Sequence, residues 1–356
     1  MTAPLIVGAG PAGSMAAILL ARAGAEPVLI DRDKEVGDAL CGGFMSWRTA
    51  RQLRAIGLEL GDLGAHHVRH LTLFAGERTA HAKLPDTGFG LSRHSLDTAM
   101  RAMAVEAGAQ LRIDRVRSAA PGIVSGDKNE YSSDAIFLAN GKYDVRGHAR
   151  PRVADDPALG IRIRIPAHRD LTAMLAETIE LHFFPGGYVG IVLQEDGSAN
   201  VCLAVRKSLL SEAGGQPRDL LDMLGRTHPA FARRMAFAAS ELPIDTIGAV
   251  PYGWIARDTM PGLFRLGDQA AVIPSLAGEG MGIALASATM AVDHWSRGGT
   301  APAYQARFAR KAARPVITAK TIWQVAETRR GGGAVTAIAR MLPFAAMQAM
   351  RASRIE

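Results

Sequence analysis

A glycine-rich stretch near the N-terminus carries the clearest chemical signal in the chain. Gly8-Ala9-Gly10-Pro11-Ala12-Gly13 has G-x-G-x-x-G spacing, directly after the apolar run Leu5–Val7 and at the start of the Ala- and Leu-rich segment 12–23. The first glycine allows a tight turn, the second lets the backbone approach a pyrophosphate, and the third lets helix and strand pack closely. Free N–H groups and the positive end of the helix dipole would face the phosphates.

An acidic residue completes this unit. The apolar segment 27–30 predicts a second strand, and it is followed by Asp31 and Arg32. At this position a carboxylate accepts hydrogen bonds from a ribose hydroxyl. Strand, glycine turn, helix, second strand and acid occur in order within about 30 residues, so the stretch predicts a dinucleotide site rather than an isolated turn.

The composition is that of an ordinary globular protein. The 356 residues include 41 basic and 34 acidic side chains, a net charge of +7 that would attract an anionic cofactor. Two cysteines form no disulfide framework or zinc spacing, which predicts a cytoplasmic protein without a metal. No apolar stretch is long enough for a membrane span. No basic run is interleaved with aromatic residues, which argues against nucleic acid as a partner.

The remaining elements that must position the site follow two patterns. Segments 46–56 and 95–107 predict helices, with Ser92 or His94 beginning the latter, and 111–116 and 134–138 predict strands. Segments 67–74 and 78–84 predict a hairpin, whereas 160–165, 178–184, 188–193 and 199–205 predict an antiparallel sheet. The segments 209–224 and 229–239 predict helices, and 263–266 predicts a further core strand.

The predicted fold is therefore α/β. A discontinuous, Rossmann-like FAD-binding domain of the glutathione reductase type takes residues 1–64, 86–155 and 250–300. An antiparallel-sheet substrate domain takes residues 65–85 and 156–249. Residues 301–356 predict a helical tail broken by Pro315, Gly331–Gly333 and Pro343. Methionines 341, 347 and 350, with Leu342 and Phe344, favour a packed helix, with an apolar lid or a membrane-surface patch as the alternative.

Four separated stretches resemble the p-hydroxybenzoate hydroxylase superfamily of FAD enzymes. They are the glycine motif with Asp31, Leu91-Ser92-Arg93, Gly267-Asp268, and the helix start Gly278–Gly282. The loop Cys41-Gly42-Gly43 and the segment from Phe184 through Tyr188 to Asn200 are more similar to its geranylgeranyl reductase branch. The matches span about 280 residues in the order of the family.

The resemblance implies FAD as the cofactor. It places Arg93 beside the cofactor, Asp268 at the ribityl or pyrophosphate region, and Cys41, Gly42 and Gly43 at the isoalloxazine ring. Backbone amides of Gly278, Gly280, Met281 and Gly282 would stabilise negative charge on that ring. Val116 completes the set of expected cofactor contacts. No general base is identified; His182, Tyr188 and Cys41 are the weak catalytic candidates.

The resemblance leaves the reaction open. A NAD(P)H-driven monooxygenase acting on an apolar aromatic, polyketide-like or isoprenoid molecule is the favoured reading, since no second dinucleotide motif is present. A reductase of prenyl double bonds, a non-catalytic flavoprotein and a nicotinamide-dependent dehydrogenase are the alternatives. Halogenation is disfavoured, because Gly187–Leu193 lacks the Trp-rich motif and no halide-activating lysine is identified. The expected partner is an apolar small molecule, with peripheral membrane contact through the tail.

Overall fold

One half of the molecule, which contains the N-terminal strand, is built on a five-stranded parallel sheet. The computed structural model describes residues 2–151 and 154–355. The strand order is β16-β10-β1-β2-β6, and every neighbouring pair is parallel. Its strands are β1 (Leu5–Val7), β2 (Val28–Asp31), β6 (Gln110–Ile113), β10 (Ile136–Leu138) and β16 (Leu263–Arg265). The doubly buried pattern of β1 and β10 explains why both are continuous apolar runs.

Helices cover this sheet. Helix α1 (Pro11–Arg22) packs against α3 (Arg93–Glu106) and α8 (Gly280–Ser296) in one apolar core. Ser92 is the N-cap of α3 and Ser46 that of α2 (Trp47–Ala55). Short 3-10 turns follow at Leu60–Leu63, Gly267–Gln269 and Ser275–Ala277. A three-stranded antiparallel sheet, β7 (Val116–Ala120), β8 (Ile123–Gly126) and β9 (Glu130–Ser132), packs on the other side through Ala119 and Val124.

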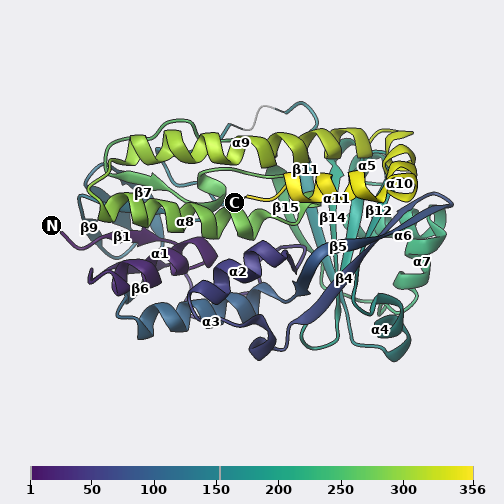
Figure 1. Ribbon diagram of the computed structural model, residues 1–356, viewed down its shortest axis with the longest axis horizontal. Coiled ribbons are helices and arrows are strands. Elements are labelled where there is room, and N and C mark those ends of the chain that lie inside the picture. The colour runs from purple at the N-terminus through teal and green to yellow at the C-terminus, as the bar shows by residue number, and fades with distance from the viewer. Residues whose placement is uncertain (1, 152–153, 356) are drawn as a thin grey trace.

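The second half is an eight-stranded sheet of order β15-β11-β14-β13-β12-β4-β5-β3. Figure 1 shows it at the opposite end of the molecule from the N-terminus. Its strands are β3 (Phe44–Met45), β4 (His66–Ala75), β5 (Arg78–Gly90), β11 (Ala158–Ile165), β12 (Thr178–Phe184), β13 (Gly187–Leu193), β14 (Ala199–Arg206) and β15 (Asp245–Val250). The sheet is mixed rather than antiparallel, because β4 and β12 pair in parallel.

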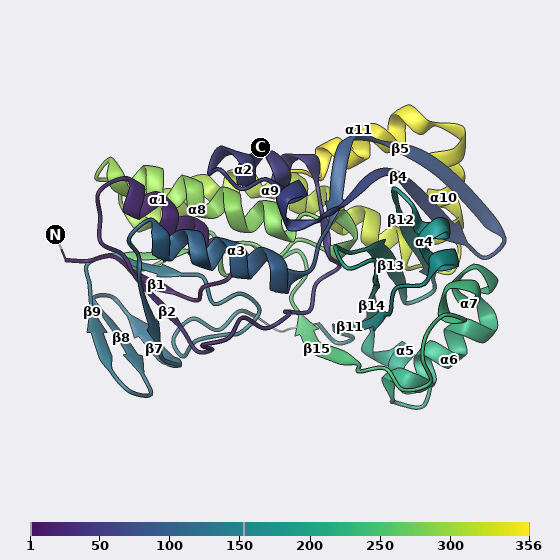
Figure 2. The same cartoon turned by 90° about the horizontal axis from the view of Figure 1, so that it is seen from below.

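Helices cover both faces of the eight-stranded sheet, as the turned view in Figure 2 shows. On one face lie α4 (Arg169–Leu175), α5 (Lys207–Glu212), α6 (Pro217–Thr227) and α7 (Pro229–Met235). On the other lie α10 (Gly331–Met341) and α11 (Pro343–Ala352). The long helix α9 (Ala301–Ala326) runs along both halves of the molecule in Figure 1.

The sequence-based predictions were correct for most elements and wrong at several boundaries. The predicted helix 209–224 is two helices, since Gly214 and Gly215 both adopt positive φ between them. Pro315 lies inside α9 and does not break it, and the three glycines at 331–333 begin α10. The predicted strand 111–116 ends at Ile113, and β7, β8, β9 and β15 were not foreseen. Residues 44–45 pair with residues 89–90 at one edge of the eight-stranded sheet.

A buried ion pair joins the eight-stranded sheet to the helices behind it. Glu180 on β12 accepts hydrogen bonds from Arg234 of α7, with Nη2 2.5 Å and Nε 2.9 Å away, and Glu180 is 2% exposed. Burial alone would raise the pKa of Glu180, but hydrogen bonds from His182 and Arg234 outweigh it and lower the pKa. The carboxylate therefore remains charged in the folded protein at neutral pH.

We predict that Glu180→Gln lowers the free energy of unfolding by about 3–5 kcal/mol, because it leaves the Arg234 charge buried without a counter-ion. The contribution of Glu180 is present above pH of about 4.3 and is lost as pH falls through the lower pKa of the folded state. Denaturant unfolding of the parent protein and of E180Q, at pH values above and below about 4.3, measures the loss in the free energy of unfolding and its pH dependence. The double variant Glu180→Leu/Arg234→Met, which removes both charges, should recover most of the loss. Equal stability of E180Q and the parent protein would contradict the prediction.

Candidate active site

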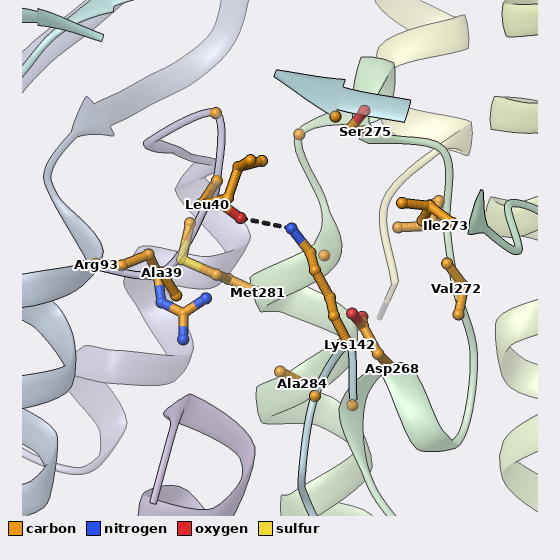
Figure 3. Close-up of a pocket in the computed structure, with 18 of the residues that line it drawn as sticks. Ala39, Leu40, Arg93, Lys142, Asp268, Val272, Ile273, Ser275, Met281 and Ala284 are labelled. Carbon is orange, nitrogen blue, oxygen red and sulfur yellow. Dashed lines mark hydrogen bonds between the residues drawn. The ribbon is translucent and has the colours of Figure 1, made fainter. Parts of the chain in front are cut away.

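One large cavity connects the two halves of the molecule. Its volume is about 1170 Å³, above the roughly 300–1000 Å³ of ordinary ligand pockets. At one end it is lined by the glycine turn and the carboxyl ends of β1 and β2; at the other it reaches α10 and α11. The cavity therefore has room for a dinucleotide and a second ligand in continuous space. Figure 3 shows part of its lining.

The glycine turn forms the floor of the first end. Gly8 adopts φ of +100°, and a Cβ there would lie 2.5 Å from the carbonyl oxygen of Ala139. Gly10 has an ordinary φ of −75°, and its nearest neighbour beyond the turn, Arg93 Nη2, would lie 3.4 Å from a Cβ. The missing side chain of Gly10 thus leaves open the space between the turn and Arg93. That is the cradle a pyrophosphate requires.

Asp31 lies where the ribose would be held. Its Oδ2 accepts the Ala9 N–H at 2.6 Å and its Oδ1 accepts the Asp33 N–H at 3.0 Å. Arg101 Nη2 lies 3.3 Å from Oδ1. A carboxylate offers about four acceptor positions, so Asp31 retains capacity for a sugar hydroxyl after these contacts. Arg101 also explains how the carboxylate tolerates its half-buried position.

Charged and polar side chains surround the central part of the cavity. Arg93 is held by Asp97, with Nε and Nη2 donating to the two carboxylate oxygens at 2.8 and 2.6 Å. Asp268 follows β16 and lines the same space. The buried Oδ1 of Asn140, at the end of β10, has no hydrogen-bond partner among the described residues. An orphaned acceptor in a cavity wall fits a site built for a ligand.

Helix α8 begins at the cavity. Gly280 and Met281 line it, and α8 has no side-chain cap, so its first amides are free to face a ligand. The turn before α8 is held by the fully buried Glu279, which accepts from Ser46 Oγ at 2.9 Å and from the Ile355 N–H at 3.2 Å. Arg354 Nη1 lies 3.3 Å from the same carboxylate. Burial raises the pKa of Glu279, against the opposing effect of Arg354.

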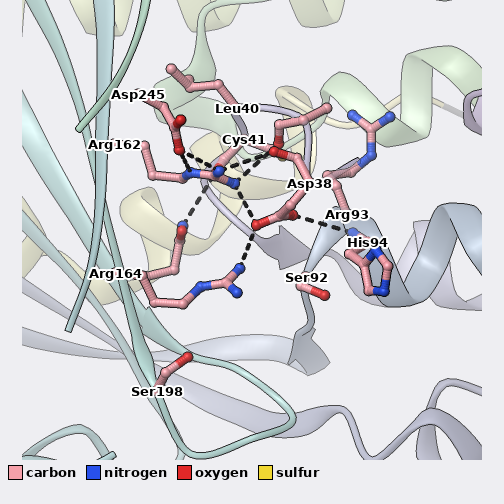
Figure 4. A network of polar contacts seen from close by, with 12 residues as sticks. Asp38, Leu40, Cys41, Ser92, Arg93, His94, Arg162, Arg164, Ser198 and Asp245 are labelled. Carbon is pink, nitrogen blue, oxygen red and sulfur yellow. Dashed lines mark hydrogen bonds and ion pairs between the residues drawn. The ribbon is translucent and has the colours of Figure 1, made fainter. Parts of the chain in front are cut away.

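The loop at residues 33–43 forms a side wall, tied down by residues that sequence analysis missed. Asp38 accepts from Arg162 and Arg164 of β11 at 2.8 and 2.6 Å and from the His94 N–H at 3.2 Å (Figure 4). Arg162 also pairs with Asp245 of β15. On the other side, Lys142 Nζ donates to the carbonyl of Leu40 (Figure 3). Two arginines alternating with isoleucines in 161–165 were the available signal.

The far part of the cavity is apolar. Alternate residues of β4, β5 and β12 line it, and every lining residue from these strands and from α10 and α11 is apolar. A group of three hydroxyls in mutual contact lies in the cavity wall: Ser275 Oγ lies 2.6 Å from Tyr188 Oη and 2.8 Å from Tyr252 Oη. Thr321 of α9 and Ser353 after α11 also contribute hydroxyls to the lining. Burial raises the pKa of both tyrosines, so both phenols keep their protons at neutral pH.

Most of the predicted site residues meet in this one cavity. Those that line it are Gly8, Gly10, Pro11, Ala12, Asp31, Arg32, Cys41, Gly42, Arg93, Val116, Tyr188, Asp268, Gly278, Gly280 and Met281. Gly13, Gly43 and Gly282 are not in the lining. A Cβ at Gly13 would lie 1.8 Å from the Gly8 oxygen and one at Gly282 2.4 Å from Glu279 Oε1, so both allow close packing. Gly43 adopts φ of +72° and packs against Gln194.

His182, one of the weak catalytic candidates, does not line the cavity. It shares a strand face with Glu180, and that face is turned away from the cavity. His182 Nε2 lies 3.1 Å from Glu180 Oε2, and its ring stacks on Phe74 at 4.5 Å. The odd-numbered residues Ile179, Leu181 and Phe183 face the cavity instead. Burial lowers the pKa of His182, which fits a neutral structural group.

The two cysteines also lie at the cavity. Cys41 and Cys202 both contribute to the lining, and both are free thiols. Burial raises the pKa of Cys202 to about 12, so this thiol is not a nucleophile at neutral pH. Cys202 was not foreseen from the sequence because its strand is apolar on both sides.

The residues present fit FAD. The open space over Gly10, the free amides of α1 and α8, the remaining acceptor capacity of Asp31 and the orphaned Asn140 Oδ1 form one continuous set. In this set Gly10 and Arg93 would hold the pyrophosphate, Asp31 the ribose, and Gly280 and Met281 the ring system.

Comparisons with known proteins agree with this fit. Residues 1–121 match the family model described as "FAD binding domain". Digeranylgeranylglycerophospholipid reductase 2 of Methanopyrus kandleri is 29% identical over 306 residues, which are 78% of this chain and 72% of the relative.

Solved structures confirm the fold over nearly the whole chain. The flavin-dependent brominase Bmp2 has a TM-score of 0.77 at 14% identity, covering 98% of this chain and 92% of its own. A geranylgeranyl bacteriochlorophyll reductase-like protein from Thermoplasma acidophilum has a TM-score of 0.75 at 17% identity, covering 99% and 95%. The family model and the relative agree with the expected FAD-binding resemblance, and at these identities the solved structures support the fold alone.

The open space over Gly10 generates a direct test of the cofactor site. We predict that Gly10→Val folds normally but weakens FAD binding by at least about 100-fold, because its side chain fills the pyrophosphate cradle. Gly10 has ordinary backbone angles, so the substitution needs no strained conformation. Titration with FAD monitored by flavin fluorescence measures the affinity.

Gly225→Ala is the matched control. Gly225 lies in α6, away from this cavity, and a Cβ there meets nothing within 4 Å. G225A should bind FAD like the parent protein. Unchanged affinity in a folded G10V variant would show that the cofactor does not pass over this turn.

Proposed function

We propose that this FAD-dependent oxidoreductase reduces carbon–carbon double bonds in the isoprenoid chain of a lipid, with NAD(P)H as the external electron donor. The observation that carries the proposal is the apolar extension of the cofactor cavity, which runs from Tyr188 to α10 and α11. The reductase from Methanopyrus kandleri, whose name states a substrate with geranylgeranyl chains, supports the same chemical class.

The character of the extension favours a hydrocarbon chain. Its walls from β4, β5, β12, α10 and α11 are entirely apolar, so a polar substituent facing these elements would be buried without a partner among them. A prenyl chain needs no hydrogen bonds and gains from burial of each methylene and methyl group. Binding the chain would also exclude water from the space between Leu181, Tyr188 and Gly42.

The hydroxyls of Tyr188, Ser275 and Tyr252 supply the proton that saturation requires. Bound FAD, once reduced by NAD(P)H, would supply the hydride to one carbon of the double bond. The other carbon takes a proton, and Tyr188 Oη is a protonated donor in the cavity wall. Ser275 Oγ, in contact with both phenols, would return a proton to Tyr188 from Tyr252, which is only half-buried and would recover its proton from water. The substrate thus gains two hydrogen atoms per bond and loses none.

A NAD(P)H-driven monooxygenase is the second candidate. The same three hydroxyls would hold the oxygen of a phenol at the start of the apolar extension, which is the observation in its favour. This candidate explains the polar group but leaves the long apolar extension without a role.

Product analysis decides between the two. The FAD-loaded protein would be incubated with NADPH and a geranylgeranyl lipid, or with candidate phenols, under labelled dioxygen. The reductase predicts a lipid product heavier by two hydrogen atoms per reduced bond, formed equally well without oxygen. Label in the product would establish the monooxygenase, and the absence of any product with either substrate class would overturn both.

We predict that Tyr188→Phe lowers kcat about 100-fold or more, because general acid catalysis typically contributes 10²–10⁴-fold. FAD affinity should stay unchanged, since only a hydroxyl is lost. The same change at Tyr131 on β9, outside the cavity lining, is the control and should leave kcat unchanged. A kcat for Y188F within twofold of the parent value would remove Tyr188 from the mechanism.

A further inference from the structure

The corner where α10 meets α11 exposes a group of large apolar side chains. Met341 is 70%, Phe344 66% and Leu342 57% exposed, and Ile338 is 48% exposed on the preceding turn. We call Ile338, Met341, Leu342 and Phe344 the apolar corner. The sequence favoured a packed helix for this segment, and these exposures correct that expectation. A soluble surface seldom gathers such side chains without an interaction that covers them.

The cavity reaches the surface at the apolar corner. Val325 of α9 and Ile338 of α10 line the cavity and are also 45% and 48% exposed. Ala345 and Ala349 of α11 line the same end. In Figures 1 and 2, α10 and α11 lie together at the end of the molecule far from the N-terminus. An apolar molecule leaving the cavity here would pass directly onto the apolar corner.

The positive charge around the apolar corner favours an anionic partner. Residues 328–353 contain four arginines, at 329, 330, 340 and 351, and no aspartate or glutamate. All four arginines are exposed. A second copy of this surface would bring like charges together, whereas an anionic lipid surface is complementary in charge and takes up apolar side chains between its headgroups.

We infer that the apolar corner, flanked by these arginines, docks the protein on an anionic lipid bilayer and places the cavity mouth at the membrane surface. The inference rests on the proposed function for the origin of the substrate. Among residues 2–151 and 154–355, no helix is long and apolar enough to cross a membrane. Attachment would therefore use insertion of side chains at the interface.

Vesicle flotation tests the docking surface directly. The FAD-loaded protein would be mixed with phosphatidylcholine vesicles containing or lacking phosphatidylglycerol, at low and high salt. We expect binding only with phosphatidylglycerol, weakened by salt. Leu342→Ser/Phe344→Ser should reduce vesicle binding about tenfold or more, because both apolar side chains no longer insert. Neither residue lines the cavity.

The control is Val105→Ser/Met174→Ser. These two residues are 46% and 43% exposed and lie on α3 and α4. The control variant should bind vesicles like the parent protein. Equal binding of L342S/F344S and the control would overturn the docking surface, as would absence of binding by the parent protein. Light scattering that shows a dimer in the parent and a monomer in L342S/F344S would assign the corner to a second copy instead.

The readouts separate this inference from the proposed function. Activity on detergent-dispersed geranylgeraniol should be equal in the parent and L342S/F344S, because the cavity itself is unchanged. Vesicle binding without double-bond reduction would leave the docking surface intact and overturn the proposed function. Double-bond reduction without vesicle binding would support the proposed function and overturn the docking surface.

Discussion

Two helix N-termini that direct unpaired amides into one cavity are the constraint on which this structure depends. Helix α1 begins after the glycine turn and α8 begins after Glu279, and the two helices pack against each other. Their amides need acceptors that the described residues do not supply at the cavity. An anionic, elongated ligand satisfies both ends at once, and the parallel sheet fixes the distance between them. The remaining side chains, Asp31, Arg93 and Asp268, line the space between these two ends.

The sequence was sufficient where local chemistry dictates structure. The glycine turn, Asp31 and the start of α8 could be predicted because each needs a particular backbone conformation or a particular charge. Ser92 and Ser46 as N-caps follow from the same kind of local rule. Most of the residues expected to contact the cofactor, Val116 among them, therefore line the cavity.

The substrate end could not be predicted in the same way, because most residues on both faces of β12 and β13 are buried. Alternation then gives two sets of residues without saying which one faces the cavity, so His182 remained only a weak candidate for the site. Tertiary contacts decide which face of β12 is turned to the cavity. Glu180 contacts both Arg234 of α7 and His182, so the odd-numbered residues face the cavity. Pro315 was likewise read as a break, although tertiary packing keeps it buried inside α9. The two arginine partners of Asp38 lie more than 100 residues away, beyond any local pattern.

The contact between Glu279 and Arg354 has a consequence for the order of assembly. The turn that leads into α8 is anchored by residues 354 and 355, about 75 positions later in the chain. During translation the glycine turn of α1 leaves the ribosome early, whereas the turn before α8 has only Ser46 as a partner of Glu279 until Arg354 and Ile355 have emerged. The part of the cavity at the glycine turn can therefore form on the nascent chain, while the part at the start of α8 gains its contacts with residues 354 and 355 only after synthesis has passed residue 355.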